Sequence, residues 1–103
     1  MGNSTHTPGP WTIQPAKTGD TFAMIRAALP GYSGTRKIAE VTDVGAAGEA
    51  NARLIAAAPE LLAALRAYDA AVGAGIDSDP EMWAKAARLT AAAIAKATAE
   101  QKA

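Results

Sequence analysis

The distribution of alanine divides this chain into two unlike parts and constrains its fold more than any other feature. Only five of the 28 alanines precede residue 46, whereas 23 of the last 58 residues are alanine. The first part contains short runs of β-type residues separated by Gly and Pro, and the second part has helical periodicity. We therefore predict an α+β fold in which a small antiparallel β-meander or hairpin in the N-terminal half packs on two to three Ala-rich helices in the C-terminal half.

The length predicts a single domain, 1–103, with a strand-rich part, 1–45, and a helical part, 46–103. Its core is expected to be thin, because an alanine methyl group buries far less apolar area than a leucine side chain. Such a chain can be stabilised by close helix packing with alanine at the contacts, or by sharing its apolar surface with a second copy. We expect the second, and hence a homo-oligomer.

Three runs in the first part are typical of strands, namely Trp11 to Gln14, Thr21 to Ala28 and Arg36 to Asp43. Pro30 and Gly31 suit the central positions of a type II turn between the last two runs, because proline fixes φ and glycine accepts a positive φ.

The second part predicts a helix from about Ala47 to Tyr68 or Val72, with a kink or a junction of two helices at Ala58, where Pro59 begins the second. A further helix follows, with Asp79 as its cap and Pro80 in its first position. The predicted apolar face of the first segment contains Asn51, Leu54, Ile55, Ala58, Leu62 and Leu65. That of the last helix contains Met82, Trp83, Ala86, Leu89, Thr90, Ala93, Ile94 and Ala97.

Charge and composition exclude several classes of function. Ten basic and ten acidic residues leave no net charge, so no basic field is available for DNA or for an anionic membrane. There is no cysteine, one histidine and no cluster of carboxylates, so we predict neither a metal site nor a catalytic centre, and no cofactor. The absence of a leader-like start and of a long apolar run predicts a soluble, cytoplasmic protein.

Two stretches hold the residue types of an anion-binding site. The loop "GYSGTRK" offers Tyr32 for stacking and Arg36 and Lys37 for charge, although an exposed turn has the same composition. The stretch "DVGAAGEANAR" is interpreted as a strand-to-helix joint, because the lysine of a phosphate-binding loop is missing. Arg53 in this stretch is either solvated or part of a site, and Asn51 needs a hydrogen-bond partner if it is buried.

Two motifs together resemble a known family. "HTPGPW" at His6 to Trp11 and "ANARLIAAAPELLAAL" at Ala50 to Leu65 are similar to motifs of small, mostly uncharacterised proteins encoded by tailed bacteriophages and prophages. The resemblance covers about Thr5 to Tyr68. It implies a phage origin and a location in the cytoplasm of an infected bacterium, and it supplies no activity.

The HTPGPW segment, called the box from here on, is interpreted as an extended entry that docks on the helix containing Asn51. Its prolines stiffen the chain, Gly9 allows a close approach, and Trp11 brings a large surface to bury. In one interpretation the box is a structural clasp only. In the other, His6, Trp11 and Arg53 also line a shared groove that holds a planar anionic ligand.

We therefore expect a non-enzymatic phage accessory protein that acts by binding. The leading hypothesis is a counter-defence protein that sequesters a nucleotide-type immune signal, cyclic or ADP-ribose-like, or that blocks a host defence protein. The alternative is a structural or interaction protein that assembles with phage or host proteins and binds no small ligand. The predicted ligand-binding residues are His6, Trp11, Tyr32, Arg36, Lys37, Asn51 and Arg53.

Overall fold

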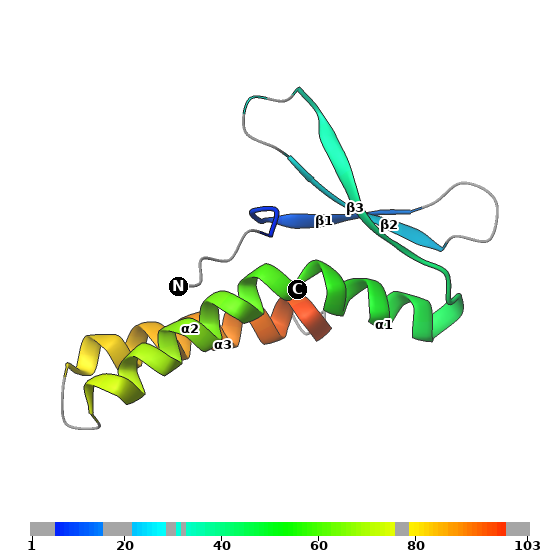
Figure 1. Cartoon of the computed structure of the whole chain (residues 1–103). Helices are drawn as coiled ribbons and strands as arrows, with labels where there is room; N and C mark the ends of the chain where they lie inside the picture. The colour runs from blue at the N-terminus through cyan, green and yellow to red at the C-terminus, as the bar shows by residue number, and fades with distance from the viewer. Residues whose placement is uncertain (1–5, 16–21, 29–30, 32, 76–78, 99–103) are drawn as a thin grey trace.

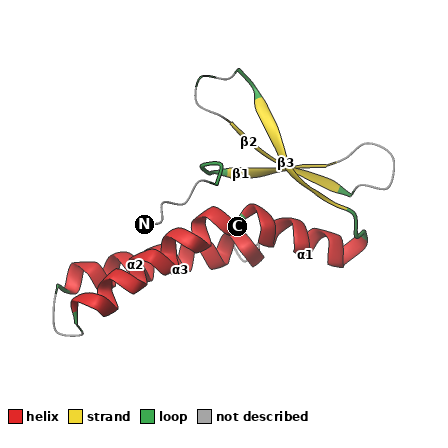
Figure 2. Cartoon of the chain, viewed as in Figure 1, coloured by secondary structure: helices red, strands yellow, loops and turns green. Residues whose placement is uncertain are grey.

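The computed structural model describes residues 6–15, 22–28, 31, 33–75 and 79–98. Three strands form one antiparallel sheet in the order β1-β2-β3, and three helices follow them, so the predicted α+β arrangement is confirmed (Figures 1 and 2). The elements are β1 (Trp11–Pro15), β2 (Ala23–Ala28), β3 (Thr35–Val41), α1 (Gly45–Ala56), α2 (Ala58–Ala74) and α3 (Pro80–Thr98).

The sheet is a meander whose central strand β2 carries the core. Ala23, Ile25 and Ala27 are buried and alternate along β2 with partly buried side chains, as expected for a strand with one face covered. In the antiparallel register, Ile13 of β1 lies opposite Ile25, and Ala39 of β3 lies opposite Ile25 on the other side. Ile13, Ile25 and Ala39 therefore lie side by side on the face of the sheet against which α1 packs.

Helix α1 has no room for a side chain at residue 48, where it packs against the β3–α1 connection and Phe22. A β-carbon at Gly48 would lie 2.2 Å from the carbonyl oxygen of Asp43 and 3.2 Å from Cγ of Phe22. Behind this contact the core cluster includes Ala52 and Ala56 of α1. The helix therefore covers the sheet with its smallest residues.

The predicted junction of two helices is confirmed. Helix α1 ends at Ala56, α2 begins at Ala58, and Pro59 lies in the first turn of α2. Proline is tolerated there because the N–H groups of the first turn have no partner within their helix. Helices α2 and α3 then form an antiparallel hairpin that extends away from the sheet (Figure 1). The predicted cap of α3 is also present, because the Glu81 amide donates to Oδ1 of Asp79 at 2.9 Å.

The predicted apolar faces of the helices are only partly confirmed, because Ala86 and Ala93 of α3 are buried as expected while several of the large residues are exposed. Leu54 and Leu65 were expected to be buried but are 54% and 66% exposed, and Ile94 of α3 is also exposed. The physical reason is that the helices pack at short distances, which only small side chains tolerate. The buried positions of the helices are Gly48, Ala52, Ala56, Ala64, Ala71, Ala86 and Ala93.

Gly31 lies in the turn predicted between β2 and β3. Gly31 has φ 73°, the positive value that the predicted type II turn requires, while Pro30 lies outside the described residues. Within the described ranges, none of the helices combines the length and the apolar character that crossing a bilayer demands.

Candidate functional site

The box is organised around one backbone carbonyl. The indole Nε1 of Trp11 donates to the Thr7 oxygen at 3.0 Å, and Nδ1 of His6 donates to the same oxygen at 2.8 Å. The two rings meet edge to face, with centroids 6.3 Å apart. The box thus forms a closed loop in which the side chains of His6 and Trp11 share one hydrogen-bond acceptor.

This loop is fixed at the place where α2 begins and α3 ends. A β-carbon on Gly9 would lie 2.9 Å from Cβ of Pro59, so the glycine permits the backbone to pass against the proline. The ammonium group of Lys96 donates to the Trp11 carbonyl at 3.2 Å and to Oε2 of Glu60 at 2.9 Å. Lys96 therefore connects the box, α2 and α3.

We expect Lys96→Met to lower the free energy of unfolding by about 1–3 kcal/mol, because the carboxylate of Glu60 would lose its cation, and its buried Oε1 has no hydrogen-bond partner among the described residues. Urea denaturation measures the change. Lys85→Met, an exposed position on the same helix, is the matched control and should change stability by no more than about 0.5 kcal/mol. Equal losses in the two variants would show that Lys96 does not connect these segments.

Asn51 does not contact the box. Its side chain is exposed and its Nδ2 donates to Oδ2 of Asp43 at 3.1 Å. Asn51 therefore takes no part in the docking of the box. The box meets Pro59 instead, and Trp11 packs against the core cluster that contains Ala52 and Ala56 of α1.

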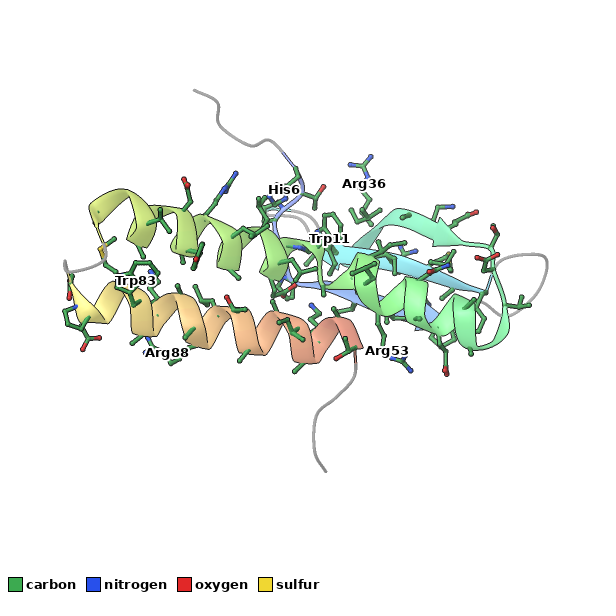
Figure 3. The ribbon with its side chains drawn as sticks, turned by 90° about the horizontal axis from the view of Figure 1, so that it is seen from below. His6, Trp11, Arg36, Arg53, Trp83 and Arg88 are labelled. Atoms are coloured by element: carbon green, nitrogen blue, oxygen red, sulfur yellow. The ribbon has the colours of Figure 1, made fainter. Side chains whose placement is uncertain are left out.

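The predicted basic residues of the loop lie on different faces of the sheet. Arg36 lies opposite Ala27, which lies opposite Trp11, so Arg36 shares a face with the box (Figure 3). Lys37, the next residue, lies on the other face and forms an ion pair with Glu40. Tyr32 lies outside the described residues.

Arg53 lies in a groove between the sheet and α1 that has a volume of about 480 Å³. Its guanidinium group pairs with Glu49 one turn earlier, at 3.4 Å. The described residues that line the groove are Ile13, Pro15, Phe22, Ala23, Val44, Glu49, Ala52 and Arg53. The groove is therefore mostly apolar, with one cation and one anion at its α1 side.

The structure separates Arg53 from the box. Figure 3 shows Arg53 pointing to the opposite side from His6 and Arg36, and neither His6 nor Trp11 is among the described residues that line the groove of Arg53. The groove shared by His6, Trp11 and Arg53, which one of the two interpretations of the sequence required, is therefore not formed. The box and Arg53 lie at two separate sites.

Several residues that line the groove of Arg53 were not predicted from the sequence as site residues. Phe22 was placed in a strand, and Ile13 was placed in another, without a role for either. The alternation of Trp11 and Ile13 with Thr12 and Gln14 was the available signal, because it places the two apolar residues on one face of the strand. It does not reveal which helix lies over that face.

Comparison with known proteins gives one result. The family model described as Salmonella phage P22 protein Y8K6 matches residues 1–101. The chain belongs to this family. No curated protein and no solved structure matches the chain significantly.

Membership in the P22 family confirms the phage origin expected from the sequence. The match extends far beyond Tyr68, where the expected resemblance ended, and includes α3 with Lys96. This extent agrees with the structure, in which α3 holds the box in place.

A second hollow in this P22-family chain lies on the other side of α1. Its volume is about 260 Å³, and it contains the Asn51 to Asp43 hydrogen bond together with Glu40. Among the described residues, no group of three or more His, Asp or Glu side chains is placed to hold a metal ion. Its acidic rim makes it a less suitable anion site than the groove of Arg53.

Proposed function

We propose that this protein is a non-catalytic binding protein whose groove between the sheet and α1 holds a small, planar, anionic ligand of the nucleotide type. The observation that carries the proposal is the position of Arg53, whose guanidinium lies beside a mostly apolar groove that also contains the ring of Phe22. Such a groove combines an apolar surface for a base with a cation for a phosphate.

The size and chemistry of the groove support this ligand class. A volume of about 480 Å³ is in the range of small-molecule sites, which are mostly apolar with a few polar groups. A guanidinium group binds phosphate through paired N–H donors, and aromatic rings stack on bases. The competing ion pair with Glu49 is a surface pair at 3.4 Å, and such pairs contribute little energy. A phosphate can therefore replace Glu49 as the partner of Arg53.

The phage origin is consistent with a role of this binding in counteracting host defence. A protein that encloses a host nucleotide signal, cyclic or ADP-ribose-like, acts against host defence by stoichiometric capture and needs no turnover. The described groove residues include a guanidinium, a carboxylate and apolar groups, which suits holding a ligand. The proposed role is therefore capture.

Calorimetric titration with AMP, ADP-ribose and a cyclic dinucleotide tests the proposal. We expect Arg53→Gln to weaken binding about tenfold or more, and Glu49→Gln to strengthen it, because the guanidinium then has no competing carboxylate. Arg66→Gln removes the same charge from an exposed position on α2 and should leave affinity unchanged. Failure of all three probes to bind, or equal weakening by Arg53→Gln and Arg66→Gln, would refute the proposal.

The function of an interaction protein without a small ligand is the second candidate. It is favoured by the apolar surface of the α2–α3 hairpin, where Leu65, Tyr68 and Val72 are each more than half exposed. Large exposed apolar patches mark contact surfaces. If the titrations show no ligand while this surface binds a protein, the second candidate replaces the first.

A further inference from the structure

The fully buried positions of the α2–α3 hairpin are all alanines, and several of its large apolar residues are exposed. The positions buried within it are Ala64 and Ala71 of α2 and Ala86 and Ala93 of α3. The large apolar residues Leu61, Leu62, Met82, Trp83 and Leu89 are half-buried, and four others remain exposed. They are Leu65 at 66%, Tyr68 at 52%, Val72 at 51% and Ile94 at 46%.

These exposed residues belong to one face, called the hairpin face. The spacing of Leu65, Tyr68 and Val72 places them on one side of α2. The ring of Tyr68 meets that of Trp83 from α3 edge to face, with centroids 5.7 Å apart. Beside them is a shallow hollow of about 480 Å³, lined among the described residues by Tyr68, Trp83, Ala86, Ala87, Thr90, Ala91 and Ile94.

The hairpin face carries no charge in its hollow. None of the described residues lining it is acidic or basic, and Figure 3 shows Arg88 of α3 pointing away from α2. The indole Nε1 of Trp83 is buried and has no hydrogen-bond partner among the described residues. A charge-free surface made of aromatic, aliphatic and alanine side chains resembles the core of an obligate interface more than it resembles an ordinary solvated helix pair.

The shape of the chain leaves this face uncovered. The radius of gyration is 16.0 Å, whereas a compact chain of this length has about 13 Å. The molecule measures 53 × 34 × 23 Å, and the hairpin extends beyond the sheet along its length (Figure 1). No described strand is therefore positioned to cover the far part of the hairpin.

We propose that the hairpin face packs against the same face of a second copy, so that two hairpins form a four-helix bundle around a two-fold axis. The hollow of each copy is then free of charge at the contact, and the large residues of each copy meet the alanine positions of the other. The interface has a sufficient area. The helices have 17 and 19 residues, so the face measures about 25 by 20 Å, and two copies bury on the order of 1,000 Å², the lower limit for a specific interface.

Sedimentation equilibrium of the full chain at micromolar concentration tests the proposal. We expect a mass of twice 10.4 kDa. The double variant Leu65→Lys with Ile94→Lys should sediment as a monomer with unchanged helical circular dichroism, because four lysines would face each other in the dimer. Leu54→Lys, at an equally exposed position on α1, should remain a dimer. A monomeric wild-type chain would overturn the proposal, and the hairpin face would then be available to a different protein. A double variant that remains a dimer would also overturn the proposal.

If the double variant does not fold, crosslinking tests whether the hairpin faces of two copies are in contact. The chain has no cysteine, so Thr90→Cys introduces a single thiol into the hairpin face and Thr35→Cys introduces one at the start of β3. A short bismaleimide should join two copies of the first variant and not of the second. Equal crosslinking of both, or of neither, contradicts the proposed contact. Arg53→Gln should remain a dimer, so loss of ligand binding and loss of assembly are separate outcomes.

Discussion

Gly48→Ala should destabilise the protein by about 3 kcal/mol or more, although alanine is the better helix former by about 1 kcal/mol. The new methyl group would lie 2.2 Å from the Asp43 carbonyl oxygen and 3.2 Å from the Phe22 ring. The oxygen belongs to the backbone and cannot turn aside as a side chain does. Phe22 is itself held to the end of β3 by a hydrogen bond from its amide to the Val41 carbonyl at 2.7 Å. Relief of the clash therefore requires a shift of the backbone between β3 and the first turn of α1.

Gly73→Ala is the matched control for this prediction. Gly73 lies near the end of α2, and a β-carbon there has no neighbour within 4 Å. The same substitution should raise stability by up to about 1 kcal/mol, through helix propensity alone. Thermal denaturation followed by circular dichroism measures both changes. If Gly48→Ala is neutral or stabilising, then α1 does not approach the sheet as closely as described.

The second large effect is expected from Ile25→Ala. Ile25 is the largest fully buried side chain among the described residues, at 0% exposure, and it lies at the centre of the core cluster. Its truncation should reduce the free energy of unfolding by about 2–5 kcal/mol, because the surrounding backbone of the sheet cannot collapse into the cavity. In a small domain this amount is a large share of the total stability. Denaturant unfolding at 25 °C gives the value.

Leu54→Ala provides the comparison, because sequence periodicity predicted Leu54 to be buried and the structure finds it 54% exposed. We expect a loss of no more than about 1 kcal/mol at this position. A larger loss from Leu54→Ala than from Ile25→Ala would support the helical face predicted from the sequence, and would contradict the face seen in the structure.

The sequence predicted the type and order of the elements because these depend on local chemistry. Proline cannot continue a helix, so the break before Pro59 follows from one residue, and the cap at Asp79 follows from the side chain that accepts the Glu81 amide. The strand at Ile25 was found from its alternating neighbours. None of these features depends on a distant part of the chain.

The buried face of the helices was not predictable in the same way. Leucine dominates any estimate of hydrophobicity, so the expected face followed Leu54 and Leu65. The face of α1 that packs is instead the one with Gly48, where a β-carbon would meet Asp43 and Phe22, and with the buried Ala52 and Ala56. Alanine occurs on every side of these helices, so its periodicity alone carries little information.

The candidate site was predicted only in part for a related reason. Arg53 was identified because its charge and its position near a glycine-rich joint are visible in the sequence. Phe22 and Val44 belong to other segments, and they meet Arg53 only when α1 lies across the sheet. The separation of His6 from Arg53 likewise depends on the docking of the box against Pro59, which no local pattern indicates.

The link from Lys96 to the Trp11 carbonyl joins residues 85 positions apart. During synthesis on the ribosome, the box is made before α3 and cannot receive this hydrogen bond until the 85 residues up to Lys96 have followed it. Contacts with such a long separation form late and slow the folding reaction. The hydrogen bond from Lys96 to Trp11 is therefore expected to form in the last stage of folding, after β1 has paired with β2.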